Sequence, residues 1–102
     1  MDIIPTINCK SLDCVRRRMA LAEEFGTGWV QVDISDGEFS DFETWNDPLE
    51  LEEEIGIKSL SFYIETHLMT ARPMEVLEDW LSIGIDRVIV HIESDLDRKS
   101  VV

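Results

Sequence analysis

The sequence predicts an α/β fold in which four parallel strands alternate with three helices, as in the first half of a (β/α)8 barrel. Short runs rich in β-branched residues alternate with amphipathic segments along the chain, and such strands become parallel neighbours joined by right-handed crossovers. A complete barrel takes about 250 residues, whereas this chain has 102. We therefore expect residues 1–102 to form a single partial barrel domain that ends where a fourth helix begins.

The first strand is expected over residues 3–7, although Pro5 is unusual in a central strand. Ser11 is a suitable N-cap for the first helix, and Gly26 supplies its stop. Between them, apolar residues recur three and four positions apart, which predicts a buried helix face. The members of this face are Leu12, Val15, Met19 and Ala22.

Residues 29–34 form the second predicted strand, followed by a turn that we expect Asp36 to cap. The next connection is at the upper end of usual loop lengths, which makes it a candidate functional loop. Its aromatic residues are Phe39, Phe42 and Trp45. Asp47 then caps a short acidic helix that begins at Pro48 and ends near Gly56.

The third and fourth strands are expected over residues 62–69 and 87–92. Between them, Pro73 opens a helix that Gly84 ends, with an apolar stripe. The stripe comprises Met74, Leu77, Trp80 and Leu81. Residues 94–97 have the character of an N-cap and first turn of a further helix. An open doubly wound sheet is the alternative, but no glycine-rich phosphate turn follows the first strand.

The charge balance argues against two classes of partner. The chain carries 22 acidic and 9 basic residues, a net charge of −13, and such a field repels nucleic-acid phosphates and anionic lipids. The one basic run, residues 16–18, fits a solvated helix face. Since the sequence shows neither a membrane span nor a secretory signal, we expect a cytoplasmic protein in which Cys9 and Cys14 are reduced packing thiols.

Polar residues gather on one predicted face of the sheet, because alternate residues of a strand face opposite sides. They are Thr6 and Asn8 on the first strand, Gln31, Asp33 and Ser35 on the second, Glu65 and His67 on the third, and His91 and Glu93 on the fourth; the apolar Met69 of the third strand shares this face. Barrel enzymes hold reactive groups at the carboxyl ends of their strands. We predict that Asp33 and His67 share a site there, whereas His91 alone fits an ordinary satisfied or surface histidine.

Four runs at the predicted strands carry a more specific signal. They are IPTI from Ile4, VQVDISDGEF from Val30, ETHLM from Glu65 and VIVHIES from Val88. In order and spacing they resemble the ribulose-phosphate 3-epimerase family, over nearly all of this chain and the first half of that family's TIM barrel. The resemblance implies an isomerase of the pentose phosphate pathway that acts on ribulose 5-phosphate and xylulose 5-phosphate.

The resemblance also implies site residues. Family members hold a divalent ion (Zn, Fe or Mn) with a His and an Asp on strand two, a His on strand three and an Asp on strand seven. Asp33 matches the strand-two Asp, a metal ligand and catalytic base, and His67 matches the strand-three ligand. Thr6 and Met69 match substrate-contacting positions. Gln31 stands in place of the first His, and an amide is a poorer ligand for these metals.

The implied reaction removes a proton beside a ketone, stabilises an enediolate and returns a proton to the opposite face. The second acid and the phosphate-binding loops would lie beyond Val102, so we expect this chain to be inactive alone. Two alternatives remain open. One is another phosphosugar barrel enzyme, although no lysine stands at a strand end for Schiff-base chemistry. The other is a non-catalytic half barrel whose unpaired edge strands drive homo-oligomerisation.

Overall fold

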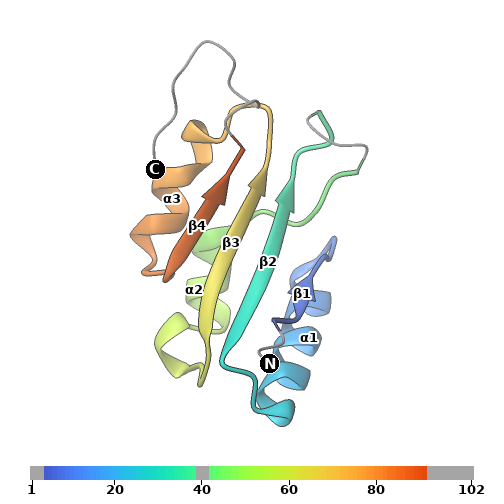
Figure 1. Cartoon of the computed structure of the whole chain (residues 1–102), viewed down its shortest axis with the longest axis vertical. Coiled ribbons are helices and arrows are strands. Elements are labelled where there is room, and N and C mark those ends of the chain that lie inside the picture. Colours follow the sequence, from blue (N-terminus) through green and yellow to red (C-terminus); the bar gives the residue numbers. More distant parts are fainter. Residues whose placement is uncertain (1–3, 39–41, 92–102) are drawn as a thin grey trace.

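The computed structural model describes residues 4–38 and 42–91, and these form a single layer of strands covered by helices (Figure 1). In chain order the elements are β1 (Thr6–Ile7), α1 (Leu12–Phe25), β2 (Trp29–Ser35), α2 (Pro48–Glu54), the 3-10 helix η1 (Ile57–Ser59), β3 (Tyr63–Met69), α3 (Met74–Ser82) and β4 (Arg87–Val90). In this part of the chain, no helix has the length and apolar character needed to cross a bilayer.

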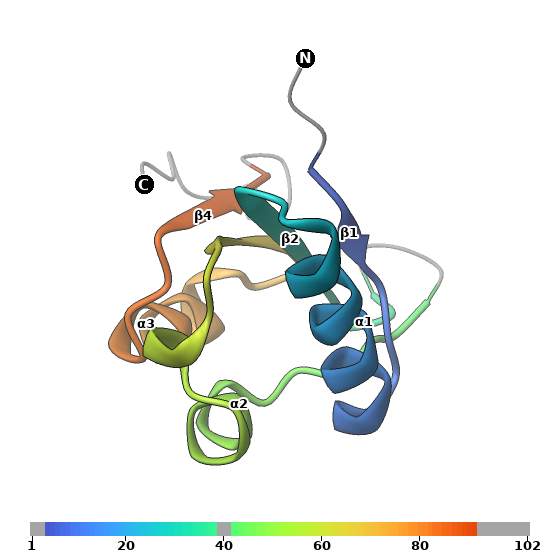
Figure 2. The ribbon, with the colours of Figure 1, turned by 90° about the horizontal axis from the view of Figure 1, so that it is seen from below.

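The sheet has the strand order β1-β2-β3-β4, and every neighbouring pair is parallel. The three helices all lie on one side of it, as the view along the strands shows (Figure 2). Consecutive strand order with one-sided helices is the arrangement of a (β/α)8 barrel, whereas a doubly wound sheet carries helices on both faces. The predicted partial barrel is therefore confirmed.

Helix α1 begins and ends where its capping residues predict. The Ser11 hydroxyl accepts a hydrogen bond from the Cys14 backbone N–H at 3.2 Å, and Gly26 ends the helix in the left-handed conformation with φ of 69°. Val15, Met19 and Ala22 are buried, and Leu12 packs against the same core. The basic run at residues 16–18 is exposed, as expected of a solvated face.

Helix α2 also follows its predicted caps. The Asp47 carboxylate accepts a hydrogen bond from the Glu50 N–H at 3.0 Å, and Pro48 occupies the first turn. The backbone turns at Gly56, whose φ is 83°. The short 3-10 helix that follows was not predicted, since only three residues take part in it and so short a turn has no periodic signal.

The predicted stripe of α3 is only half correct. Leu77 and Trp80 are buried, but Met74 and Leu81 are 45% and 47% exposed. Met74 lies three residues before Leu77 and Leu81 four residues after it, so both fit the helical spacing, but they lie to one side of the direction that Leu77 and Trp80 share and fall at the margin of the stripe.

Strands β1 and β4 are shorter than expected. The β1 ladder begins at Thr6 because Pro5 has no N–H to donate, although the Pro5 carbonyl still accepts a hydrogen bond from Gln31 at 2.9 Å. Strand β4 ends at Val90. The predicted helix start at residues 94–97 lies outside the described residues, as do Ile92 and Glu93.

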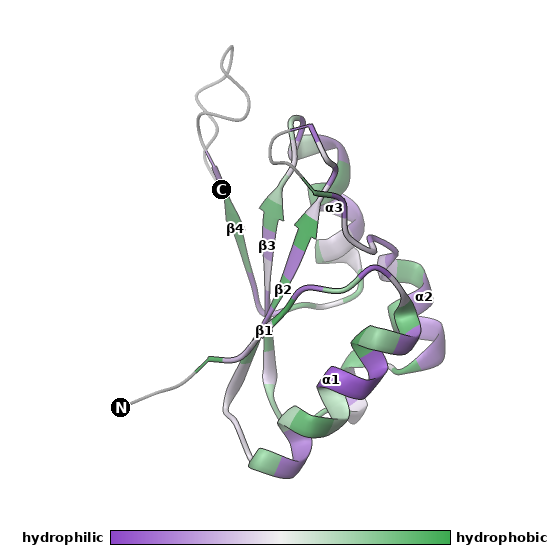
Figure 3. Ribbon diagram, turned by 90° about the vertical axis from the view of Figure 1, so that its right-hand side faces the viewer, coloured by the Kyte–Doolittle hydropathy of each residue, from purple (hydrophilic) through white to green (hydrophobic). Residues whose placement is uncertain are grey.

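The core lies between the sheet and the helices, and Figure 3 shows this side-by-side arrangement. Trp80 is fully buried and meets Trp45 edge-on at 5.9 Å between ring centroids. Each indole N–H has a partner: Trp80 donates to Asn46 and Trp45 to Glu50. Trp45 is thus a core residue that anchors the loop after β2. Of the other aromatic residues of that loop, Phe42 is 38% exposed and Phe39 lies outside the described residues.

The two cysteines contradict the expectation of free thiols. Cys9 and Cys14 form a disulfide, with their Cα atoms 5.7 Å apart. The chain reverses between β1 and α1, which brings residues five apart in sequence face to face at the start of the helix. A Cα separation in this range suits a disulfide. Sequence spacing without the path of this turn could not show it.

Candidate active site

The face of the sheet opposite the helices carries the polar residues that strand parity predicts. Along β2 the core-facing residues Val30, Val32 and Ile34 are buried, and they alternate with Gln31 and Asp33, which are half-buried. The register between strands places Gln31 beside Glu65 and Asp33 beside His67. The prediction that Asp33 and His67 stand at one level is therefore confirmed.

Four side chains at this level and at the positions next to it form a continuous set of contacts, here called the carboxyl-end cluster: Gln31, Asp33, His67 and His91. The Gln31 amide nitrogen donates to Asp33 Oδ1 at 2.9 Å and lies 3.3 Å from His67 Nδ1. Asp33 Oδ1 and His67 Nδ1 are 3.4 Å apart. On its other side, His67 Nε2 lies 2.8 Å from His91 Nε2.

The cluster is accessible but largely shielded from solvent. The side chains of Asp33 and His67 are 12% and 20% exposed. A carboxylate at this depth is stabilised by each hydrogen-bond donor that faces it, because partial burial strengthens hydrogen bonds to a charged group. The open side of the cluster faces away from the helices.

His91 is the member that sequence reasoning undervalued. It is hydrogen-bonded, as expected of an ordinary histidine, but its partner is His67, and the two rings lie 4.9 Å apart between centroids. In register, His67 pairs with Ile89 rather than with His91. The contact thus reaches two residues beyond the register partner Ile89, to the residue that follows β4. The available signal was parity, which already put His91 on the polar face.

The remaining predicted site residues border this cluster. Thr6 stands in register with Gln31 and is exposed, whereas Met69 stands in register with Ser35 and is half-buried. Thr6 therefore lies at the level of Gln31, and Met69 lies two residues beyond His67 on the same face. Ser35 is buried instead, because its backbone N–H and its hydroxyl are bound to Thr44 and to the Phe42 carbonyl.

Asp36 caps its turn, as predicted, and does more. Its Oδ1 atom accepts the Glu38 N–H at 2.9 Å, while Oδ2 accepts the Ala71 N–H, also at 2.9 Å. One carboxylate therefore joins the loop after β2 to the loop after β3.

A second group of side chains occupies the same face nearer the amino ends of the strands. This amino-end cluster comprises Trp29, Tyr63, Glu65 and Arg87. Arg87 Nε donates to Glu65 Oε1 at 2.6 Å, and the Arg87 guanidinium stacks 4.3 Å from the Trp29 ring centroid. Trp29 and Tyr63 lie 5.2 Å apart. Glu65 is thus an ion-pair partner, and its position facing Arg87 removes it from the candidate reactive groups.

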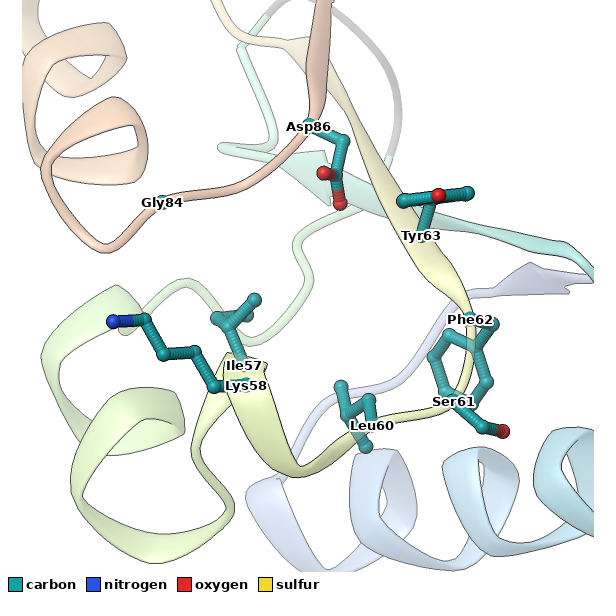
Figure 4. A pocket seen from close by; sticks show the side chains of 8 residues that line it. All are labelled: Ile57, Lys58, Leu60, Ser61, Phe62, Tyr63, Gly84 and Asp86. Atoms are coloured by element: carbon teal, nitrogen blue, oxygen red, sulfur yellow. The ribbon is translucent and has the colours of Figure 1, made fainter.

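A pocket of about 370 Å³ also lies at the amino ends of β3 and β4 (Figure 4). Its one acidic residue, Asp86, already accepts the Ile64 backbone N–H at 2.9 Å. Since barrel enzymes place their chemistry at the opposite, carboxyl ends of the strands, the carboxyl-end cluster is the better candidate.

The carboxyl-end cluster does not fit a divalent transition-metal ion. Among residues 4–38 and 42–91, no group of three or more His, Cys, Asp or Glu side chains is placed to hold one. Asp33 and His67 could supply two ligands, but Gln31 directs an amide N–H₂ group at both. An N–H donor cannot coordinate a cation, and stable sites of this kind need at least three protein ligands.

Comparison with known proteins points to one family. A model of the ribulose-phosphate 3-epimerase family matches residues 2–102. Proteins named ribulose-phosphate 3-epimerase from Chlamydia trachomatis and Chlamydia pneumoniae are 28% and 29% identical over 100 and 98 residues, or 98% and 96% of this chain. The protein of that name from Treponema pallidum is 29% identical over 94 residues, or 92% of the chain. The chain spans 42% of the length of each of these relatives.

Proposed function

The chain belongs to the ribulose-phosphate 3-epimerase family, and from this premise we propose that residues 1–102 supply the first part of an epimerase barrel. The barrel would interconvert ribulose 5-phosphate and xylulose 5-phosphate. Of the alternatives, a Schiff-base phosphosugar enzyme has the least support, because the polar face of the described strands carries carboxylates and imidazoles but no lysine.

The observation that carries this proposal is the position of Asp33. Its carboxylate lies at the carboxyl end of β2, 12% exposed and held by the Gln31 amide. A carboxylate fixed in this way can remove the proton from the substrate carbon beside the ketone, provided it reaches that carbon at hydrogen-bond distance. We assign Asp33 as the base, and Thr6 and Met69 as side chains that contact the sugar.

Inversion at the substrate carbon needs a second acid on the opposite face of the enediolate. The described strands offer only Asp33 at this level, since Glu65 is committed to Arg87. We propose that the second acid and the phosphate-binding loops come from strands that follow these four, where barrels of this kind bind phosphate. The net charge of −13 agrees with this, because it disfavours a phosphate site on this part alone.

The test is an assay of solvent deuterium entering C3 of ribulose 5-phosphate. We expect no exchange with this chain alone, with or without Mn²⁺, Zn²⁺ or Fe²⁺. A fusion of the chain to the remaining part of the Chlamydia trachomatis relative should exchange and epimerise. Turnover by the chain alone that disappears in Asp33→Asn would contradict the proposed need for later strands. An active fusion that keeps its rate in Asp33→Asn would contradict the role of Asp33.

A non-catalytic role as a self-associating half barrel is the second candidate. It is favoured by the two edges of the described sheet, since β1 and β4 each pair with one neighbour only, and exposed edges promote association. Sedimentation analysis separates the two candidates: a stable dimer without deuterium exchange, alone or in the fusion, would support this second role. Within the first proposal, we place the protein in the cytoplasm, where the pentose phosphate pathway operates.

A further inference from the structure

The Gln31 side chain is the centre of the carboxyl-end cluster, and its contacts fix where protons lie. Its amide nitrogen is within hydrogen-bond distance of Asp33 Oδ1 and of His67 Nδ1. A carboxylate accepts and never donates, so the group facing Asp33 must be the N–H₂ end of the amide and not its oxygen. The second hydrogen of the same N–H₂ group can then reach His67 Nδ1 at 3.3 Å. The competing arrangement, in which His67 Nδ1–H donates to Asp33 Oδ1, has the longer separation of 3.4 Å and would leave that amide hydrogen without this acceptor.

Two consequences follow for the histidines. If His67 Nδ1 accepts from Gln31, a neutral His67 must carry its proton on Nε2. His67 Nε2 lies 2.8 Å from His91 Nε2, and a hydrogen bond between these atoms needs one donor and one acceptor. His67 is the donor, so His91 accepts at Nε2 and carries its own proton on Nδ1.

We propose that Gln31 is a positioning residue that holds Asp33 and His67 together, as a bound cation would in this site. It joins the carboxylate and the imidazole through one neutral amide and sets the tautomers of both histidines. This cluster therefore assembles without a divalent ion, in contrast to what the family resemblance implies. The inference rests on contacts of the described residues and not on epimerase activity, so the experiments below need no turnover.

The first experiment reads the tautomers directly in the chain labelled with ¹⁵N-histidine, by long-range ¹⁵N–¹H correlation at a pH where both rings are neutral. We expect a proton on Nε2 of His67 and on Nδ1 of His91. Gln31→Leu removes the amide without adding charge, and it should shift both rings toward tautomer mixtures. Thr6→Val is the matched control, because Thr6 stands in register with Gln31 and its loss should change neither ring.

A proton on His67 Nδ1 in the unaltered chain would overturn the proposal, and so would identical tautomers in Gln31→Leu and the unaltered chain. These spectra are informative even where a variant folds poorly, since the unaltered chain alone tests the assignment.

The second experiment asks whether Gln31 is what keeps a metal out. Zn²⁺ is titrated into the chain and followed by calorimetry. The unaltered chain and Asp33→Asn should bind with affinities within about threefold of one another, as expected of diffuse acidic surface sites. Gln31→His supplies a third ligand beside Asp33 and His67, and it should bind at least about tenfold tighter, an effect of the size that ligand-shell changes produce.

The control for this gain is Ala20→His, which adds a histidine on the exposed side of α1 and should bind like the unaltered chain. The double variant Gln31→His/His67→Ala should lose the gain. Tight Zn²⁺ binding by the unaltered chain that falls at least tenfold in His67→Ala would show that the amide does not replace a metal, and would overturn the proposal.

Discussion

Two clusters lie on the same face of the same strands, one level apart, and they are built in opposite ways. In the amino-end cluster, the charge of Glu65 meets the charge of Arg87 at 2.6 Å, and Arg87 is stacked on Trp29 at 4.3 Å. In the carboxyl-end cluster, the described residues that Asp33 meets are Gln31, through its amide, and His67, through its ring. No arginine or lysine contacts it among the described residues.

This difference indicates that the amino-end cluster stabilises the fold, whereas the carboxyl-end cluster is suited to proton transfer. A buried carboxylate matched by a guanidinium has its charge compensated inside the protein, and it has little left to offer a substrate. A carboxylate held by the neutral amide of Gln31, with no arginine or lysine of the described residues beside it, can still accept a proton from a substrate. The chain thus places a structural ion pair, Glu65 on β3 with Arg87 on β4, one level below its candidate base Asp33 on β2.

The largest effect is expected when each of the two carboxylates is removed in turn from the fusion barrel described above, which tests the comparison directly. Asp33→Asn should lower turnover by about 10³-fold, the scale expected for loss of a general base. Glu65→Gln should leave turnover within about threefold, since Glu65 serves the fold. The measurement is the rate of epimerisation at saturating ribulose 5-phosphate. Equal losses in the two variants would show that the clusters do not divide their roles as proposed.

The next effect concerns stability. Arg87→Met leaves the Glu65 carboxylate, 5% exposed, without its cation, and we expect the free energy of unfolding to fall by about 3 kcal/mol. The double variant Glu65→Met/Arg87→Met removes both charges and should recover to within about 1 kcal/mol of the unaltered chain. Urea unfolding followed by tryptophan fluorescence measures both. An Arg87→Met variant as stable as the parent would mean that water already solvates Glu65.

A smaller effect is expected from a region that touches neither cluster. Replacing Cys9 and Cys14 together by alanine removes the cross-link at the start of α1. The free energy of unfolding should fall by about 2 kcal/mol, because a short closed loop restricts the unfolded chain only modestly. Reduction of the unaltered chain should reproduce this loss, and the reductant should not affect the double variant. The histidine tautomers should stay as they are, which a repeat of the ¹⁵N spectra checks.

The smallest effect is a pH dependence at Glu23 on α1. Hydrogen bonds from the Ser61 hydroxyl and then from the Ser61 backbone N–H lower the pKa of Glu23 below its ordinary value of 4.5. A lowered pKa stabilises the fold above the unfolded-state pKa, and this stabilisation is lost as the pH falls through the folded-state pKa.

Glu23 is fully exposed, so the change in melting temperature between the unaltered chain and Glu23→Gln should be small at neutral pH. It should vanish in acid. A difference that grows as the pH falls would contradict the direction of the pKa shift.

The elements with explicit local signals could be predicted from sequence. Helix α1 has a capping serine and a terminal glycine, so its limits follow from local hydrogen bonding. Strand parity then placed Asp33 and His67 on one face, near the carboxyl ends of neighbouring parallel strands. Each of these inferences needs only local geometry and the parallel order of strands.

Contacts that depend on the path of the chain in space could not be predicted in the same way. The disulfide could be predicted only with the knowledge that the chain reverses direction before α1. The approach of His91 to His67 depends on the register of β4 and on the reach of two rings across it. The role of Gln31 was visible only as a departure from the family pattern, because hydrogen bonding to two partners at once is a property of the folded site.

The carboxylate of Asp36 has a mechanical consequence. Because it accepts hydrogen bonds from the backbone N–H groups of Glu38 and Ala71 at the same time, the connections that follow β2 and β3 are anchored to the same side chain. A displacement of either connection would therefore disturb a carboxylate that also holds the other. The connections after β2 and β3, which lie beyond Asp33 and His67 at the carboxyl ends of the strands, are therefore linked to each other. We expect a ligand that moves one of these connections to move the other as well.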